Sequence, residues 1–401
     1  MDSEIEFNRT DILAQLNNNG SLSEKILAIH DAAHSCCDFI HRISVAIYDP
    51  KLDLLKTLVH STDDGNPLPS YQARLADIPS LHRISLSGKP RVIHDLAAFS
   101  GREQPHTRRI VEHGFRSSYT TPMYMNEQLT GFIFFNSRLP NVLNEPTLSH
   151  LDMMARLISL LIGMELNLVT MMQGALRTAA SFSSYRDPET GAHLDRMSHF
   201  SRLIACEIAK DRGLTDEFAE AILWAAPMHD IGKIAIPDHI LLKPGKFTPD
   251  EFESMKTHTT KGREIIDSML RNFNLGNASL APVMTSIAEY HHENFDGSGY
   301  PCGLKGEAIP IEARIIATAD VFDALTSRRC YKPAWDNASA FAEIDALSKW
   351  KLDRRCVEIL LDNQPAITEI QTRFRDEAEV AHREDRGRPD SKWQDRATQS
   401  A

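Results

Sequence analysis

The stretch "HHENFDGSGYP", residues 291–301, sets two adjacent histidines before acids and a turn rich in glycine. Neighbouring residues on a helix point about 100° apart, because one helical turn takes about 3.6 residues. His291 and His292 therefore cannot easily hold one ion together, but they can reach two ions on either side. Glycines permit tight turns and Pro301 stiffens the exit, so we expect a shaped loop after the histidines. Tyr300 is expected to pack in this loop or to border a substrate entrance.

Similar side chains recur through the second half of the sequence. "MHDIGK" provides another adjacent pair, His229 and Asp230, and "DPETGAH" spaces Glu189 and His193 so that both lie on one helix face. Two metals about 3.5–4 Å apart can hydrolyse phosphate esters, and a carboxylate such as Asp230 can bridge them. The candidate metal ligands are Glu189, His193, His229, Asp230, His258, His291, His292 and Asp320, with Asp323 one turn after the last.

Each of these residues has a simpler explanation when it is taken alone. A single histidine is usually a surface residue, and an acid near a helix end is usually a cap. Independent explanations are hard to sustain at every position together. The combination therefore points to metal-dependent chemistry much more specifically than any of its parts.

The composition sets limits on the class of protein. The chain has 401 residues, of which 42% are hydrophobic and 25% charged, so two globular domains are expected. A net charge of −11 argues against a polynucleotide-binding surface, which needs an excess of Lys and Arg. Six cysteines without regular spacing read as reduced thiols in a cytoplasm, with no zinc site among them. The most apolar run, residues 157–164, is too short for a membrane span, and the first residues lack a signal core.

The pattern along the chain predicts a multidomain protein. After a short segment, residues 1–22, the strand-like stretches "RISVAIYD", "TLVHS", "PRVIHDL" and "LTGFIFFNS" indicate an α+β sensor-like domain over residues 23–165. Apolar residues three, four or seven apart then predict one long connecting helix, residues 147–180, which overlaps the end of that domain. A largely helical domain comes next, over residues 185–367, and the polar residues 371–401 are expected to be disordered.

The apolar stripe of the long helix allows two interpretations. It can pair with a second copy of the chain in a homodimer, or it can pack on its own domain. We favour the homodimer. The stripe consists of Leu148, Leu151, Met154, Ile158, Leu161, Leu168, Met172 and Leu176.

The second half of the chain resembles the HD-GYP family of the HD phosphohydrolases. The resemblance rests on "HDIGKIAIPDHILLKPG", "HHENFDGSGYPCGLKGEAIP" and "RIIATADVFDALTS", and it includes the signature Gly299-Tyr300-Pro301. It implies an all-helical domain that hydrolyses cyclic di-GMP to pGpG, and in some members on to GMP. The family's metal ligands fall on His229, Asp230, His258, His291, His292 and Asp320.

The resemblance also implies the cofactor and the substrate contacts. Members with three metals use a further Glu and His, which match Glu189 and His193, while Asp323 matches a position near the third metal. The family favours iron or manganese, and a His and carboxylate set without thiolate agrees with that choice. A metal-bound hydroxide is expected to attack phosphorus while Lys233 stabilises the developing charge. Arg329 and Lys332 match phosphate contacts, although Cys330 stands where the family commonly has Pro.

The first domain resembles a GAF domain, with PAS as the neighbouring alternative. The resemblance rests on "HRISVAIYDPKLDLLKTLVHS" and "LTGFIFFNS" within residues 23–165. It implies a pocket for a small-molecule ligand, which the sequence does not name, and an exit helix that regulates hydrolysis. Cys36, Cys37, His60 and His94 are candidate haem or redox ligands, but ordinary packing is the favoured interpretation.

Three other functions compete with cyclic di-GMP hydrolysis. The same site can act on 3′,3′-cyclic GMP-AMP, and the metal ligands do not discriminate between the two dinucleotides. A general HD nucleotidase is disfavoured by the GYP loop. A non-catalytic scaffold that binds a dinucleotide and recruits GGDEF-type partners is disfavoured by the complete ligand set, although recruitment is compatible with catalysis.

Overall fold

The computed structural model describes residue 16 and residues 20–62, 67–68, 71–99, 105–183, 191–273, 280–327 and 334–375. Contacts between residues divide the chain into two compact units. The first unit comprises Met1–Ala179, Ala205–Trp224 and Glu264–Thr285, and the second comprises Ala180–Ile204, Ala225–Arg263 and Ser286–Ala401. The predicted domain limits, the initial segment and the disordered tail stay predictions, since residues 1–15 and 376–401 lie outside the described residues.

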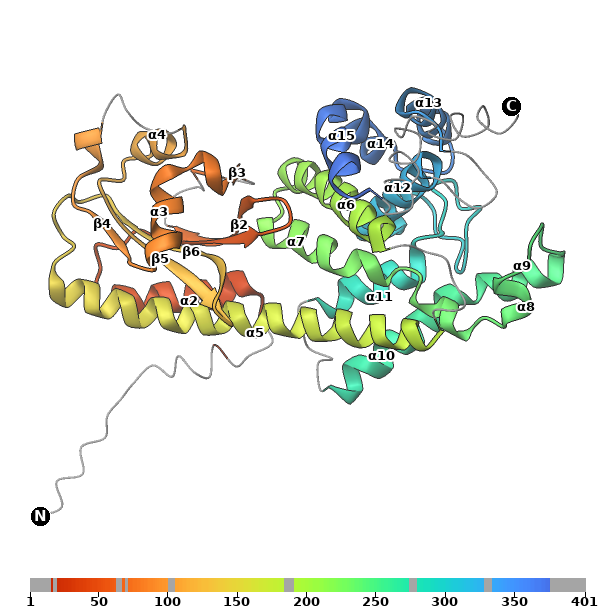
Figure 1. Cartoon of the computed structure of the whole chain (residues 1–401), viewed down its shortest axis with the longest axis horizontal. Helices are drawn as coiled ribbons and strands as arrows, with labels where there is room; N and C mark the ends of the chain where they lie inside the picture. The colour runs from red at the N-terminus through yellow and green to blue at the C-terminus, as the bar shows by residue number, and fades with distance from the viewer. Residues whose placement is uncertain are drawn as a thin grey trace, which may run out of the picture. The chain divides into compact units, whose positions relative to one another are not determined.

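The first unit is built on a six-stranded sheet in the order β3-β2-β1-β6-β5-β4, with every neighbouring pair antiparallel (Figure 1). The strand-like stretches of the sequence form β1, β2, β4 and β6, so the expected α+β architecture is confirmed. Strand β5 was not expected, because its sequence "SSYTTPMYM" is polar and contains a proline. The strands are β1 (Arg42–Asp49), β2 (Leu54–Thr62), β3 (Gln72–Arg74), β4 (Arg91–Ile93), β5 (Ser117–Met125) and β6 (Gln128–Ser137).

The central strands approach each other closely at a glycine. Gly131 of β6 pairs with Ile47 of β1. A Cβ atom at this position would lie 2.0 Å from the carbonyl oxygen of Ala46. Only glycine therefore allows the two strands to keep their register here.

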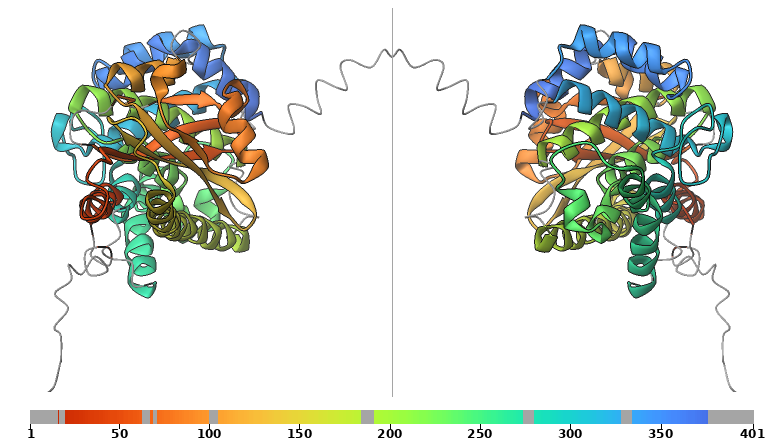
Figure 2. Two further views of the ribbon diagram at one scale, coloured as in Figure 1. Left: turned by 90° about the vertical axis from the view of Figure 1, so that its left-hand side faces the viewer. Right: turned by 90° about the vertical axis from the view of Figure 1, so that its right-hand side faces the viewer.

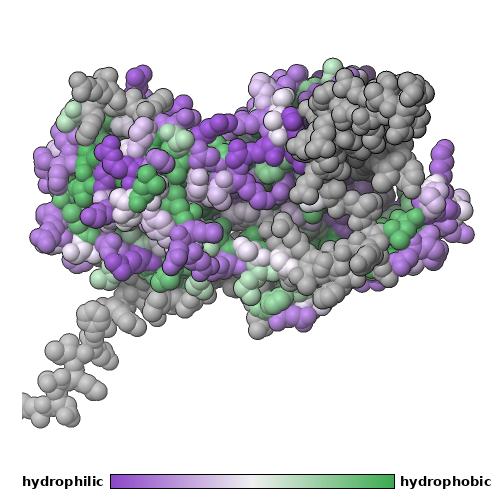
Figure 3. Space-filling model, in the orientation of Figure 1, coloured by the Kyte–Doolittle hydropathy of each residue, from purple (hydrophilic) through white to green (hydrophobic). Residues whose placement is uncertain are grey.

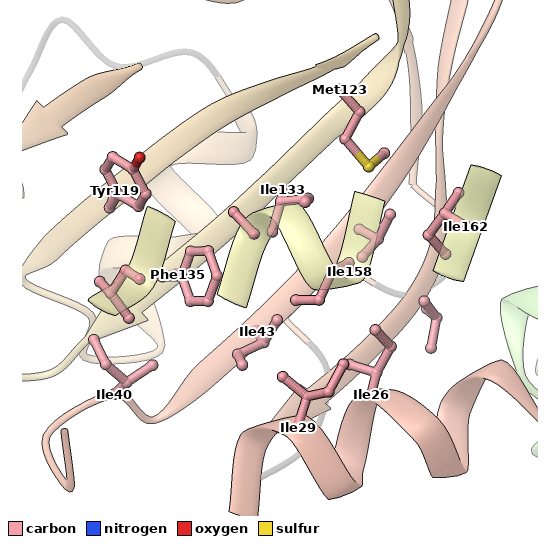
Figure 4. Packing of buried hydrophobic residues seen from close by; sticks show 14 of the residues in the cluster. Ile26, Ile29, Ile40, Ile43, Tyr119, Met123, Ile133, Phe135, Ile158 and Ile162 are labelled. Atoms are coloured by element: carbon pink, nitrogen blue, oxygen red, sulfur yellow. The ribbon is translucent and has the colours of Figure 1, made fainter. Parts of the chain in front are cut away.

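Helices cover the two faces of the sheet, and together with it they form what we call the sheet domain. Helices α2 (Leu22–His34) and α5 (Glu145–Ser183) lie on one face, and α3 (Pro79–Ser87) lies on the other (Figure 2). Ile26 and Ile29 of α2 and Ile158 of α5 point into one apolar cluster with residues of β1 and β6 (Figure 4). Leu81 and Ile84 of α3 are buried against the opposite face. The remaining helices of this domain are α4 (Pro105–Glu112), η1 (Leu75–Asp77) and η2 (Leu96–Phe99).

Helix α5 confirms the prediction of one long helix, which begins two residues earlier and ends three residues later than expected. The first part of the predicted stripe packs on its own domain, because Leu151 and Ile158 are fully buried there and Leu148, Met154 and Leu161 pack against the same cluster. The side chain of Leu176, at the end of the stripe, lies outside the described residues. By length and composition, the segment Glu145–Met172 could also cross a membrane, a property that core helices of soluble proteins share. On the face that Figure 3 shows, the described residues are largely hydrophilic, with separate apolar patches.

The described residues after α5 contain helices and connecting turns, which confirms the expected all-α architecture of this part. Short 3₁₀ helices, rather than α-helices, surround the HD pair. The α-helices are α6 (Gly191–Arg212), α7 (Asp216–Ala225), α8 (Asp238–Leu241), α9 (Pro249–Lys256), α10 (His258–Asn272), α11 (Ala281–Tyr290), α12 (Ile311–Thr326), α13 (Asn337–Leu347), α14 (Arg354–Asp362) and α15 (Gln364–Arg373). The 3₁₀ helices are η3 (Ala226–Met228), η4 (Ile231–Ala235) and η5 (Gly306–Ala308).

Candidate metal centre

Two groups of metal-ligand side chains lie in the second unit. The donor atoms within each group are all within 4.8 Å of one another. Both adjacent pairs of the sequence stand at helix ends: His229 and Asp230 lie between η3 and η4, and His291 and His292 come directly after α11. The first group is Asp230, His258, His291 and His292, and the second is His193, His229 and Asp320.

The Asp230 carboxylate lies between the two groups. Its Oδ1 atom is 3.2 Å from His258 Nε2 and 3.7 Å from His291 Nε2. Its Oδ2 atom is 3.2 Å from Nε2 of His229, which belongs to the second group. One oxygen thus faces each group, as a bridging carboxylate requires.

Backbone carbonyls set the tautomer of three of these histidines. His229 Nδ1 is 3.0 Å from Ala226 O, His258 Nδ1 is 2.7 Å from Met255 O, and His291 Nδ1 is 2.9 Å from Ile287 O. A carbonyl only accepts, so each Nδ1 carries the proton and donates it. Each Nε2 then presents a lone pair toward the centre, which is the usual arrangement of histidines that bind metals.

The first group consequently brings lone pairs together with no proton between them. His258 Nε2 is 3.4 Å from His291 Nε2. Asp230 Oδ1 is buried and has no hydrogen-bond partner among the described residues. Donor atoms of this kind repel one another unless a cation lies between them, so the residues present fit a divalent metal.

The charge states agree with that fit. Burial raises the pKa of Asp230, but the charge of Lys233 and the neighbouring His229 and His258 hold it well below its usual value. Burial lowers the pKa of His291, partly opposed by Asp230. Burial and the neighbouring His291 hold the pKa of His292 well below its usual value. At neutral pH the centre therefore offers an anionic carboxylate at Asp230 and neutral imidazoles at His291 and His292.

Asp323 positions His193 through the Nδ1 atom of the imidazole. Its fully buried carboxylate accepts from His193 Nδ1 at 2.7 Å and from Arg196 Nε at 2.7 Å. The Nε2 atom of His193 then lies 4.0 Å from Asp320 Oδ1. Asp323 is outside both donor groups. Arg196 was missed from the sequence, although its place three residues after His193 on α6 puts both side chains on one helix face.

A glycine brings the HD segment close to His258. A Cβ atom at Gly232 would lie 1.8 Å from the carbonyl oxygen of His258 and 2.5 Å from the backbone nitrogen of Gly262. The glycine of "HDIGK" thus lets η4 pack directly on α10. This contact holds Asp230 and His258 at their short separation.

The signature loop stands beside the first group. Tyr300 lies with its ring centroid 4.9 Å from that of His292. The buried Glu293 accepts from the backbone nitrogens of Cys302 at 2.7 Å and Leu304 at 3.0 Å, and it thereby fixes the loop. A Cβ atom at Gly299 would lie 2.2 Å from the backbone nitrogen of Asn294, so this position needs glycine. Glu293 was not singled out from the sequence.

The predicted substrate contacts are only partly visible. Lys233 Nζ lies 2.7 Å from Asp230 Oδ2, at the edge of the donor groups. Glu189, Arg329 and Lys332 lie outside the described residues, as does Cys330. Their roles stay predictions.

Comparison with known proteins agrees with this geometry. Residues 187–356 match the family model described as an HD domain. This part of the chain is an HD domain. The HD domain is similar to a cyclic di-GMP phosphodiesterase response regulator, RpfG, of Xanthomonas campestris, with 48% identity over 47% of this chain and 47% of that protein. A cyclic di-GMP phosphodiesterase of Thermotoga maritima is 45% identical over 49% of this chain and 50% of that protein.

A relative named for another substrate is also similar. The 3′3′-cGAMP-specific phosphodiesterase 2 of Vibrio cholerae is 42% identical over 44% of this chain and 32% of that protein. The chain thus spans about half or less of the length of these relatives. Among solved structures, the phycocyanobilin-bound GAF domain of a cyanobacterial phytochrome is 18% identical, with a TM-score of 0.31, over 38% of this chain and 90% of that chain.

The role of Asp323 can be tested with Asp323→Asn. The amide loses the charge that holds His193 and Arg196, so we expect metal affinity at the second group to fall about 10–100-fold. Metal per chain, measured by mass spectrometry during titration with a chelator, should show a weakened site while the first group keeps its ion. The matched control is Asp345→Asn, which removes an exposed carboxylate that pairs with Arg354 at 2.9 Å. Equal metal affinity in both variants would contradict the role of Asp323.

Proposed function

We propose that this chain hydrolyses the phosphodiester bonds of cyclic di-GMP to pGpG, and pGpG on to GMP. The observation that carries the proposal is the Asp230 carboxylate, which directs one oxygen to each of two donor groups. The names of two relatives, both cyclic di-GMP phosphodiesterases, support the choice of substrate. The activity of the whole chain is a proposal, because the match to these two relatives covers about half of this chain and about half of each of them.

The HD domain binds divalent metal, and the two groups would hold it. We propose iron or manganese, because the donors are imidazoles and carboxylates without a thiolate. The two donor groups indicate two ions. A third ion would need Glu189. When bound, such ions polarise a phosphate and lower the pKa of water.

The side chains of the chain supply the remaining features of the reaction. Asp230 stays ionised and balances the positive charge of the centre. Lys233 lies close enough to exchange its contact with Asp230 for a non-bridging phosphate oxygen, which it would bind as a point charge. Tyr300 borders the site and, with its pKa raised by burial, stays neutral, so it can contact the substrate without repelling it.

A second candidate substrate is 3′,3′-cyclic GMP-AMP. Two relatives of Vibrio cholerae named for that dinucleotide are 42% identical over 179 residues and 41% identical over 125 residues. The two substrates share the phosphodiester ring that the metal centre recognises and differ in one base. We propose cyclic di-GMP as the preferred substrate.

The function can be tested by substituting the bridging carboxylate. Asp230→Ala should lower turnover of both dinucleotides at least about 100-fold and should lower metal content, because one carboxylate serves both groups. Product separation after incubation with each dinucleotide measures the rates, and mass spectrometry measures the metal. Asp362→Ala, at an exposed carboxylate on α14, is the control. Full turnover by Asp230→Ala with unchanged metal would overturn the assignment. A metal-loaded wild type that binds but does not cleave would indicate a scaffold that recruits GGDEF-type partners.

We also propose that the sheet domain regulates hydrolysis through α5. The support is the continuity of this helix, which runs unbroken from Glu145 to Ser183. Inserting two alanines after Gly174 rotates the residues beyond the insertion by about 200°. We expect this insertion to change kcat at least about fivefold at unchanged metal content. Inserting seven alanines restores the phase to within about 20° and should preserve the regulated rate. Equal kcat in both insertions and the wild type would contradict regulation through the helix.

We propose a homodimer through the outer face of α5. Four large apolar side chains are 65–69% exposed there and succeed one another at spacings of seven, four and seven residues, as in a coiled-coil seam. This stripe differs from the one that the sequence suggested, which is used within the domain. The exposed stripe is Met153, Leu160, Met164 and Met171.

We also propose that the protein is cytoplasmic, in agreement with the free cysteines of the described residues.

The dimer can be tested with the double variant Leu160→Glu, Met164→Glu. Charges on facing stripes repel, so the mass measured by light scattering after gel filtration should fall from a dimer to a monomer. The control is Leu86→Glu on α3, which is 77% exposed and lies outside the stripe. A monomeric wild type would contradict the dimer, and recovery only in detergent extracts of membranes would contradict both the dimer and the cytoplasmic location.

A further inference from the structure

The sheet domain contains a cavity of about 520 Å³. It is enclosed by residues of the sheet together with α3 and α4, and most of its lining is apolar. Small-molecule sites in proteins typically have volumes of about 300–1,000 Å³. The volume therefore suits a small organic molecule. The charged side chains that line the cavity indicate which kind of molecule this is.

All charged groups in the described lining are cationic. The cavity is lined by Arg42, Arg83 and Arg91 and by neither an aspartate nor a glutamate among the described residues. A buried charge without an opposite charge is costly, since it loses its hydration and gains no ion pair. The described residues supply no such charge, so an anionic ligand would offset this cost.

Arg42 shows this deficit most clearly. Its side chain is 2% exposed. Its Nη1 donates to Asn136 Oδ1 at 3.0 Å, and the Asn136 amide in turn donates to Ser118 Oγ at 3.0 Å. Its buried Nε has no hydrogen-bond partner among the described residues. A neutral amide orients this guanidinium and does not balance its charge.

Arg91 of β4 repeats the pattern. Its Nε is also buried and has no hydrogen-bond partner in the described part of the chain. Two guanidiniums that line one cavity thus each keep an inner donor available. Arginine at such a position is suited to carboxylate or phosphate, whose oxygens accept from its planar fork.

The neighbouring titratable groups do not supply the missing charge. Burial lowers the pKa of Arg42 to about 10, which leaves it charged at neutral pH. Burial and the charge of Arg42 lower the pKa of His60 to about 4. Burial and Arg91 lower the pKa of His106 to about 4. Tyr71, whose hydroxyl lies 3.3 Å from His106 Nδ1, has a raised pKa because of burial and stays neutral.

We propose that this cavity binds a small amphipathic organic anion, with its carboxylate or phosphate against Arg42 and Arg91 and its apolar body against Leu81, Val92 and Phe134. The inference assigns a chemical class to the ligand of the sheet domain. It is independent of the proposed hydrolysis, because none of these residues belongs to the metal centre. It therefore holds or fails separately from the phosphodiesterase activity.

The probe for this site is 8-anilinonaphthalene-1-sulfonate, an amphipathic anion whose fluorescence rises in apolar surroundings. The matched neutral probe is N-phenyl-1-naphthylamine, which has the same aromatic body without the sulfonate. Both are titrated into the full-length, metal-loaded protein. We expect one saturable site per chain for the anion and at least about tenfold weaker binding of the neutral probe. Equal affinity for the two probes would overturn the proposal.

Two variants locate the anion. Arg42→Met and Arg91→Met should each weaken binding of the sulfonate at least about tenfold and leave binding of the neutral probe unchanged. Unchanged neutral binding shows that the cavity is intact. If Arg42→Met fails to fold, sulfonate binding by Arg91→Met tests the proposal, because Arg91 is less buried. Arg108→Met, at an exposed arginine of α4 outside the cavity, is the control. Unchanged sulfonate affinity in the folded cavity variants would overturn the proposal.

Competition then identifies the charged group that the site prefers. Octanoate, octyl phosphate and octanol share one apolar chain and differ in the head. We expect octanoate or octyl phosphate to displace the sulfonate from wild type at least about tenfold more effectively than octanol. The more effective of the two anions indicates a carboxylate or a phosphate ligand. Equal displacement by octanol would show that the cavity recognises only apolar bodies, which contradicts the proposal.

Discussion

The Asp230 carboxylate is the constraint on which the rest of the helical part depends. It is ionised, its Oδ1 atom is buried, and imidazole lone pairs surround it, an arrangement that is unfavourable without a cation. The surrounding fold is organised to hold it in place. Backbone carbonyls orient the histidines, and Gly232 permits the close packing of η4 on α10. The local structure thus holds donor atoms at separations where their lone pairs and charge would repel one another without a bound cation.

The sequence predicted the centre well because its residues sit in short, unusual motifs. Adjacent ligand residues such as His229–Asp230 were recognisable, and these two fall in different donor groups as predicted. His291 and His292 fall in the same group, so the prediction that they reach two ions on either side is wrong. Both come after α11 has ended, and the divergence of about 100° between neighbours on a helix does not apply to them. Their position at helix ends was not predicted, because an HD pair does not specify whether the helix continues. Arg196 and Glu293 were missed since each acts on another residue through tertiary contact, and arginine and glutamate side chains are usually solvent-exposed.

In the sheet domain, the periodicity of the sequence predicted helices and strands better than it predicted the surfaces against which they pack. The long helix and four strands were expected, whereas β5 was not, because Pro122 and its polar neighbours resemble a loop. The predicted apolar stripe is present on α5, but residues that we favoured as a dimer surface pack in the core of the domain. Helix α5 has two apolar faces, one in the core and one exposed, and spacing alone does not tell which face meets which partner. The buried Arg42 likewise reads as an ordinary strand residue until its surroundings are known.

Arg196 connects the metal centre to the far end of the helical part. Its Nε holds Asp323, while its Nη1 donates to the carbonyl oxygen of Phe374 at 2.8 Å. Phe374 also stacks on His199, with ring centroids 4.7 Å apart. The last turn of the described chain is therefore a structural support for His193. A protein shortened at residue 367, the end predicted for the helical domain, would keep every candidate metal ligand and still lose the anchor that orients one of them.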